Sequence, residues 1–283
     1  MSLSELSAAI PERLPASLNF ADLGSTFNAV IARKSIHLQP SSGNSFGPEG
    51  IRIIRINITS QDYMLPETFR VQFKFTVDEG VWRPLSTPAA LFDRVRVISQ
   101  GVVISDESHS DRLQCLHHEW MSKDQYQMLA AEGWNIEKFD DDGSPIFEKM
   151  DAGESKRINM SFITTPLFTQ KKLIPLRYCP LVVELQLSQN YTNISYSLAA
   201  GETAPKYTIT DANALCDTLQ LDPALDNVLA ERHMQDQIPI KMREWSTMKH
   251  SNNSLRNAEW NVQILKGVTR LCVFIFRSVD IAS

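Results

Sequence analysis

The chain has 283 residues, of which 43% are hydrophobic and 22% are charged, so it can bury one large core or two of average size. Its formal net charge of -5 argues against a protein that coats nucleic acid through a basic surface, because neutralising phosphates requires clustered Lys and Arg. The sequence has no run of about 18 apolar residues and no basic segment leading into an apolar one at its start. We therefore expect neither a transmembrane helix nor a secretion signal.

The four cysteines are isolated along the chain, at Cys115, Cys179, Cys216 and Cys272. Zinc sites usually bring cysteines in pairs two to four residues apart, and disulfide-stabilised domains are much denser in cysteine. We therefore expect all four thiols to be reduced and unpaired.

The N-terminal segment 1–48 has little periodicity and is expected to form an arm or extended segment, with room for a short helix in its apolar patch at 27–38. Strand signals begin at residue 51. The stretch 51–59, IRIIRINIT, changes phase at Ile53 and Ile54, which indicates a β-bulge or a change of packed face. The stretch 68–77, TFRVQFKFTV, alternates without interruption, which predicts a strand with one apolar and one polar face.

Residues 91–106, LFDRVRVISQGVVISD, are typical of two short strands joined near Gln100 and Gly101. The segment 111–134 predicts a helix, because its apolar residues recur at helical spacing. The stripe consists of Leu113, Leu116, Trp120 and Met121. The acidic segment 137–156 that follows is expected to be an exposed loop.

Further strands are predicted at 157–168 and 179–189, and the polar, turn-rich segment 190–206 is expected to contain a domain boundary. After it come a predicted strand at 207–222, a short helix at 222–235 with Pro223 in its first turn, and strands within 238–250, 259–267 and 268–279. Strands and helices do not alternate regularly, so a parallel βαβ sheet is not expected. Two antiparallel sheets packed face to face would bury the apolar face of 68–77. The sequence therefore predicts a mainly β protein, a jelly-roll β-sandwich with short inserted helices.

Residues that could carry chemistry are few. The sequence has neither a Gly-rich phosphate loop nor a GxSxG motif. The neighbouring residues His117, His118 and Glu119 point about 100° apart on a helix and cannot hold one ion together. The histidines His109 and His233 stand alone. We predict no catalytic, cofactor-binding or metal-ligating residue, and no enzymatic activity.

Two further patterns have a structural explanation. The stretch FDDDG resembles the start of a calcium loop, but no Glu stands at the twelfth position counted from Asp140, so a solvated acidic loop is expected. A sugar-binding platform could use exposed tryptophans, although Trp in a β-protein more often lies in the core or at an interface. The tryptophans in question are Trp120, Trp134, Trp245 and Trp260.

Three segments resemble the double jelly-roll major capsid proteins of polinton-like viruses and virophage-type elements, in the order that the family has them. In the first segment, 86–120, the matching residues are Leu91, Phe92, Arg94, Val95, Arg96, Val97, Gly101, Val103, Asp106 and Arg112. In the second, 164–187, which is similar to the end of the first jelly roll, they are Phe168, Lys172, Pro175, Leu176, Leu181 and Glu184. The third, 214–245, resembles the opening of the second jelly roll.

The resemblance implies a capsid subunit that forms trimeric, pseudo-hexameric capsomers of an icosahedral shell. It implies self-association, contacts with neighbouring capsomers and with penton or minor capsid proteins, and a place in the virion after assembly inside the host cell. Neither direct binding of nucleic acid nor insertion into a membrane is expected, and no cofactor is implied.

The expected domains are an N-terminal arm at 1–48, a first jelly roll at 49–195 and a partial second one at 196–283. The ~75 residues after position 205 are fewer than eight strands and their loops need, so we expect a truncated second roll. The alternatives are a single jelly-roll protein, either a penton-type subunit or a carbohydrate-binding module, and an enzyme of the cupin type. Cupins place two or three His and a carboxylate on neighbouring strands, whereas most of the His here fall on predicted helices or loops.

Overall fold

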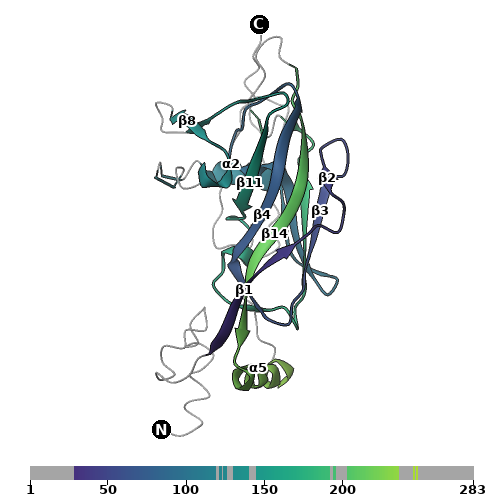
Figure 1. The fold of residues 1–283 in the computed structure, drawn as a ribbon, viewed down its shortest axis with the longest axis vertical. Helices are drawn as coiled ribbons and strands as arrows, with labels where there is room; N and C mark the ends of the chain where they lie inside the picture. The colour runs from purple at the N-terminus through teal and green to yellow at the C-terminus, as the bar shows by residue number, and fades with distance from the viewer. Residues whose placement is uncertain are drawn as a thin grey trace, which may run out of the picture. The chain divides into compact units, whose positions relative to one another are not determined.

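A computed structural model of the chain describes residues 29–118, 121–122, 124–125, 130–139, 145–191, 194–195, 203–235, 245 and 247 (Figure 1). Within these residues the architecture is a sandwich of two antiparallel β-sheets with short helices at its ends and edges. None of the described helices combines the length and the apolar character that crossing a membrane requires.

The first sheet has the strand order β1-β14-β4-β11, and every neighbouring pair in it is antiparallel. Its strands are β1 (Val30–Leu38), β14 (Lys206–Leu221), β4 (Tyr63–Glu79) and β11 (Ser155–Ser161). The two long strands β4 and β14 lie side by side through the centre of the sheet (Figure 1). This sheet therefore joins strands from both ends of the described chain.

The second sheet has the order β3-β13-β6-β7 and is also antiparallel. Its strands are β3 (Ile53–Ile58), β13 (Leu181–Leu187), β6 (Phe92–Ser99) and β7 (Val102–Ser108). In chain order the eight long strands cross from one sheet to the other at each step, except at the β6–β7 hairpin. Eight strands in two such sheets are the connectivity of a jelly roll, so the predicted fold class is confirmed.

Short elements fill the connections between these strands, and one helix, α5, follows the last of them. They are β2 (Ser45–Phe46), β5 (Val81–Trp82), η2 (Pro88–Leu91), α2 (Ser110–His118), η3 (Ala130–Glu132), β8 (Ile136–Phe139), β9 (Pro145–Phe147), β10 (Met150–Asp151), α4 (Pro166–Thr169), β12 (Ile174–Pro175) and α5 (Pro223–Gln235). Strand β2 pairs with β14, β12 with β4, β5 with β10 and β8 with β9. The insertions are therefore anchored by short pairings.

The core lies between the two sheets and is rich in aromatic side chains. The alternating residues of β4 all point into it and are at most 1% exposed: Phe69, Val71, Phe73, Phe75 and Val77. The ring of Phe73 meets Phe92 of β6 edge-on with their centroids 6.4 Å apart, and this contact joins the two sheets. At one end Phe69 stacks on Phe168 of α4 with centroids 4.1 Å apart. The alternation in the sequence is thus explained by a single buried face.

The β6–β7 hairpin has a two-residue turn, because Ser99 pairs with Val102 and leaves Gln100 and Gly101 between them. Both turn residues have positive φ angles, 49° and 82°. This is the turn type whose twist matches that of the flanking strands, and it favours Gly at the second position. The predicted junction near Gln100 and Gly101 is confirmed.

Two strands lie outside the range expected for the first jelly roll. The strand β1 belongs to the segment 1–48, which was expected to be an arm, yet it pairs with β14 from Val30 to Leu38. The strand β14 falls in the segment 196–283, which was expected to belong to a second roll, yet it pairs with β4. The jelly roll of the described chain therefore runs from β1 to β14, beyond the interval 49–195 on both sides.

Three local predictions need correction. Residues 121–122 are not helical, so 111–134 is not one continuous helix and α2 covers only its beginning. The segment 137–156 contains the strands β8, β9 and β10 in addition to loops. Of the two explanations for the phase change at Ile53 and Ile54, the β-bulge is wrong, because β3 pairs with β13 in unbroken register. The apolar side chains change face instead, with Ile53 exposed and Ile54 buried.

Replacing Phe73 tests the importance of the intersheet contact. The variant Phe73→Ala should lower the free energy of unfolding by about 3–5 kcal/mol, because it leaves a cavity between two rigid sheets. Urea unfolding followed by fluorescence measures this loss. The variant Lys74→Ala, at the neighbouring exposed position, is the control and should stay within ~0.5 kcal/mol of the wild type. Equal stabilities of the two variants would contradict the assignment of the buried face.

Glu132 of η3 is a buried carboxylate beside β11. It accepts hydrogen bonds from the backbone N–H of Ser161 at 3.0 Å and from its hydroxyl at 2.5 Å, and Arg70 Nη1 lies 3.6 Å away. Removal from water raises the pKa of Glu132, and the Ser161 hydrogen bonds and Arg70 offset this effect only in part. The ionised side chain therefore lowers stability relative to its protonated form.

The pH dependence of Glu132→Gln follows from this shift. A raised folded-state pKa means that the contribution of Glu132 to stability is complete below the unfolded pKa and is lost as the pH rises through the folded value. The variant cannot ionise, so over the pH range that begins near ~4.3, the ordinary pKa of Glu, its Tm relative to the wild type should rise with pH. Calorimetry across this range measures the difference, with Glu137→Gln on exposed β8 as the control. A Tm difference that does not change with pH would contradict the assignment.

Candidate functional site

The outer face of the sheet β3-β13-β6-β7 carries the most ordered set of charged side chains among the described residues. Along each strand, buried residues alternate with residues that point away from the core. The outward positions at one level of the sheet are occupied by Arg55, Glu184, Arg96 and Asp106, one from each strand. Glu184 is paired in register with Arg55 and Arg96, and Arg96 is paired with Asp106. We call these four residues, together with Arg94, the charge ladder.

The charge ladder is held together by ion pairs and hydrogen bonds between its arginines and its carboxylates. Arg96 Nη2 lies 2.5 Å from Glu184 Oε2, and Arg55 Nε lies 3.7 Å from the other oxygen of the same carboxylate. Arg94 binds both oxygens of Asp106 through Nε at 2.7 Å and Nη2 at 2.5 Å. Such two-pronged contacts between a guanidinium and a carboxylate fix geometry as well as supply energy. The ladder thus ties all four strands together on the side opposite the core.

Two carboxylates, Asp106 and Glu184, hold the charge ladder together. The hydrogen bonds from Arg94 lower the pKa of Asp106, although partial burial opposes this shift. Glu184 is only 12% exposed even though it points outward, because the two arginine side chains flank and cover it. A carboxylate in this position needs its cationic partners, since removing them would leave a poorly hydrated charge.

An apolar row runs beside the charge ladder at the next outward level. It contains Val182, Ile98 and Val103, which are paired across β13, β6 and β7. At the tip of the β6–β7 hairpin, Val102 is 68% exposed and Val103 is 47% exposed. Large apolar side chains that are exposed next to one another on a rigid hairpin are typical of a contact surface. The outer face therefore combines a polar ladder with an apolar edge.

The residues that carry the resemblance to capsid proteins fall into two groups. Most of the apolar ones are in the core, namely Leu91, Phe92, Val95, Val97, Phe168, Leu176 and Leu181. Four polar ones meet in the charge ladder: Arg94, Arg96 and Asp106 from the first segment, and Glu184 from the second. Two segments far apart in the chain therefore converge on one surface. This contact between the two segments could not be predicted from the sequence, because the pairing of the strands within the sheet was not predicted.

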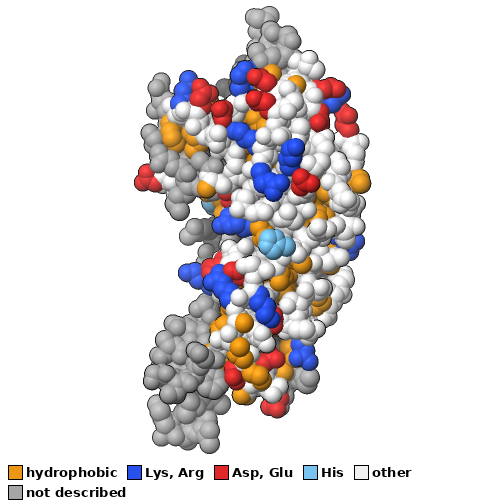
Figure 2. All heavy atoms as spheres, viewed as in Figure 1, with side chains coloured by type: hydrophobic (Ala, Val, Ile, Leu, Met, Phe, Trp, Pro, Cys, Tyr) orange, Lys and Arg blue, Asp and Glu red, His pale blue; other side chains and the backbone are white. Residues whose placement is uncertain are grey.

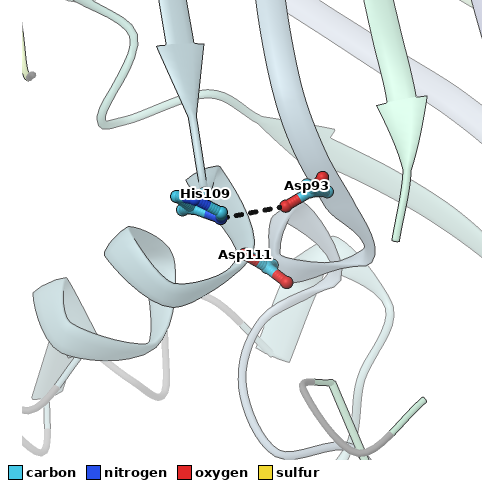
Figure 3. Close-up of side chains that lie close together, drawn as sticks. All are labelled: Asp93, His109 and Asp111. Carbon is cyan, nitrogen blue, oxygen red and sulfur yellow. Dashed lines mark ion pairs between the residues drawn. The ribbon is translucent and has the colours of Figure 1, made fainter. Parts of the chain in front are cut away.

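A second group of side chains lies at the corner between β7 and α2. His109 Nδ1 is 3.5 Å from Asp93 Oδ1, and the nearest ligand atoms of Asp93, His109 and Asp111 all lie within 4.8 Å of one another (Figure 3). His109 was predicted to stand alone, and the structure places it beside two carboxylates. The sequence holds little signal for this cluster, because Asp93 and His109 are brought together by the β6–β7 hairpin.

Glu107 lies beneath this corner and is buried. It accepts hydrogen bonds from the hydroxyls of Ser110 at 2.6 Å, Thr164 at 2.8 Å and Thr165 at 3.2 Å. Burial raises the pKa of Glu107, and the three hydroxyl donors oppose the rise. The amide of Gln114 donates to Thr164 at 2.6 Å, so the network joins β7, α2 and the segment before α4. These bonds hold the corner in one arrangement.

The remaining candidates from the sequence do not form a site among the described residues. Burial lowers the pKa of His117, whose neighbour Glu119 lies outside the described residues together with Asp140. Trp134 is 3% exposed and part of the core, Trp245 is half-buried, and Trp120 and Trp260 are outside the described range.

Three thiols belong to the described range, and none of them forms a disulfide bond there: Cys115, Cys179 and Cys216. Burial raises the pKa of the Cys216 thiol to about 12, so this side chain is unreactive at neutral pH. The fourth cysteine, Cys272, lies outside the described residues.

Other described surfaces carry charged and apolar side chains in less regular arrangements. A hollow of about 240 Å³ lies along β10 and the start of β11, where Lys156 pairs with Glu148 at 3.0 Å. Figure 2 shows basic and acidic side chains intermixed over the region of β4 and β14, and hydrophobic atoms that gather where Figure 1 has α5. The exposed apolar side chains at the start of β1 and on α5 are Val30, Ile31 and Val228.

Comparisons with known proteins find similarity only among solved structures. No protein-family model and no curated protein matches the chain. The major capsid protein of Faustovirus matches with a TM-score of 0.49 and 8% identity, over 74% of this chain and 58% of that one. VP54 of PBCV-1, fitted into a reconstruction of the virophage Sputnik, matches with a TM-score of 0.48 and 15% identity, over 74% and 46%.

The major capsid protein of mavirus matches with a TM-score of 0.39 and 15% identity, over 74% of this chain and 52% of that one. The chain spans about half the length of these solved proteins. All three TM-scores are below 0.5, so the strand order described above, and not these matches, defines the fold as a jelly roll.

Glu184→Gln tests whether the charge ladder stabilises the sheet. Removing the central negative charge leaves Arg55 and Arg96 without their common partner, so the free energy of unfolding should fall by about 1–2 kcal/mol. Urea unfolding measures the change. The control is Glu79→Gln, which removes the exposed ion pair with Lys206 and should change stability by less than ~0.5 kcal/mol. If both variants lose the same small amount, the ladder has no special structural role.

Proposed function

We propose that this chain is a structural subunit of a viral capsid and that it assembles into trimeric, pseudo-hexameric capsomers of an icosahedral shell. One observation carries the proposal. Two segments that resemble double jelly-roll capsid proteins contribute Arg94, Arg96, Asp106 and Glu184 to a single ladder on one sheet of a jelly roll. The resembling residues are thus linked in space as well as ordered along the chain.

The physical properties of the described residues fit such a role. A shell subunit must resist deformation, and here an aromatic core joins the two sheets while the charge ladder ties the strands of one sheet from outside. Lateral contacts need exposed apolar groups on rigid supports, which Val102 and Val103 provide at the hairpin tip. We also propose that a second jelly roll follows the first, as in the family that the sequence resembles.

The partners in this proposal are further copies of the chain, neighbouring capsomers, and penton or minor capsid proteins, within a virion that assembles inside the host cell. A subunit of this kind performs no reaction, so we propose that the chain is not an enzyme. A single jelly-roll penton-type subunit remains the main alternative. A carbohydrate-binding module is less favoured, because two of the described tryptophans, Trp82 and Trp134, are buried and cannot contribute to an exposed sugar platform.

Native mass spectrometry of the purified chain at micromolar concentration tests the proposal. A trimer of about 96 kDa is expected, three times the chain mass of 32.0 kDa, because permanent assemblies bury large matched surfaces. Negative-stain electron microscopy of the same sample should show capsomers. A chain that stays monomeric under all assembly conditions and binds a sugar array would favour the binding module instead.

The double variant Val102→Lys, Val103→Lys then locates the contact surface. Two lysines on the exposed hairpin tip should abolish the trimer or the contacts between capsomers, while Tm changes little because neither side chain is in the core. The control is Val228→Lys on α5, an equally exposed apolar position in another part of the molecule. Unchanged assembly of the double variant would exclude the hairpin tip as a contact.

A further inference from the structure

We propose that Asp93, His109 and Asp111 form a binding site for one divalent transition-metal ion, with zinc as the best-fitting member of the class. The three side chains come from the start of β6, from the junction between β7 and α2, and from the first turn of α2 (Figure 3). One imidazole nitrogen and two carboxylates are a donor set that zinc accepts. The site is independent of the proposed capsid role.

The spacing of the ligand atoms carries the proposal. His109 Nδ1 and Asp93 Oδ1 are 3.5 Å apart, which is longer than a good hydrogen bond of about 2.7–3.2 Å. Two ligands bound tetrahedrally to one ion at ~2.0–2.2 Å lie about 3.4 Å from each other. One ligand atom from each of the three residues lies within 4.8 Å of the other two. For all three to bind one ion, the side chain of Asp111 must therefore move closer to the other two by on the order of 1 Å.

Asp93 and His109 both lie where the backbone departs from regular strand geometry. On β6, Gln186 pairs with Arg94 and Leu187 with Phe92, so Asp93 is the extra residue of a β-bulge. A bulge changes the direction of a side chain relative to a regular strand. His109 has a φ of 56°, a left-handed conformation that turns the chain from β7 into α2. Both side chains are thereby directed toward the same corner.

Asp111 is fully buried and oriented by its own hydrogen bonds. Its Oδ1 accepts the backbone N–H of Arg112 at 2.7 Å, and its Oδ2 accepts the hydroxyl of Ser188 at 3.3 Å. These two bonds fix the direction in which the carboxylate points. Hydrogen bonds of this kind orient the ligands of metal sites.

The charge balance also favours a dication. Two carboxylates and a neutral imidazole carry a charge of -2, and the N-terminus of α2 offsets roughly half a unit of it. The guanidinium of Arg94 also acts electrostatically on Asp93, but its short contacts are with Asp106 on the outer face of the sheet. The imidazole disfavours Ca²⁺ and Mg²⁺, which prefer oxygen ligands only. Asp93 and His109 are about one-third exposed, which leaves room for water as a further ligand.

Zinc binding to the full chain, freed of metal with a chelator, tests the site. Calorimetric titration with ZnCl₂ should give one ion per chain and a rise in Tm with zinc concentration. His109→Asn should weaken binding at least tenfold, and Asn tolerates the left-handed backbone, so the metal-free variant should keep its Tm. Asp93→Asn should weaken binding likewise.

The matched control is His37→Asn, which removes an exposed imidazole on β1 and should leave the zinc affinity unchanged. Replacing zinc by Co²⁺ adds a spectroscopic readout, because visible absorption bands report direct coordination and should be lost with His109→Asn. Equal zinc affinity in the wild type, His109→Asn and Asp93→Asn would mean binding of an adventitious ion only and would overturn the proposal. Trimer formation is measured separately, so failure of this site leaves the capsid proposal standing.

Discussion

The structure depends on covering the apolar face of β4. Five consecutive inward side chains of this strand cannot remain in water, and a single sheet has no means to bury them. The second sheet supplies the cover, and the contact between Phe73 and Phe92 marks where the two sheets meet. Because aromatic rings bury about 150–250 Å² each, a few such contacts dominate the energetics of the core. The positions of the outer surfaces follow from this packing.

Burying alternate side chains of each strand also determines which side chains point outward from the sheet. Once Val95, Val97, Val183 and Leu185 point inward, the residues between them must point outward at matched levels. The charge ladder is therefore a consequence of register, and the bidentate contact of Arg94 with Asp106 closes it at the sheet edge. The rigid outer face and the aromatic core are two results of the same alternation.

The sequence predicted those parts of the structure that depend on local periodicity. The alternation at 68–77, the turn at Gln100 and Gly101, and the helix after Pro223 all depend on neighbouring residues. Pairing between distant strands was not accessible in this way. The short apolar patch at 27–38 did not indicate that this segment pairs with β14. Whether such a patch joins a sheet depends on its partner strand, which is distant in the sequence.

The candidate sites illustrate the same limit. Arg94, Arg96 and Glu184 were singled out through resemblance, but their ion pairs arise from the pairing of β6 with β13, which periodicity alone does not specify. His109 looked isolated because its neighbours Asp93 and Asp111 approach it only after the β6–β7 hairpin forms and the chain turns into α2. Side-chain clusters of this kind depend on tertiary structure, and single-sequence reasoning finds them only by chance.

The pairing of β1 with β14 has a consequence for how the chain folds. The first sheet places the earliest described strand next to the last one, with most of the jelly roll between them in sequence. Closing so long a loop costs entropy before the contact stabilises anything, so this pairing should form late and make folding slow. During synthesis, β4 would leave the ribosome well before its neighbour β14. Its edge would stay unpaired in the meantime, when chaperones could protect the nascent chain from association.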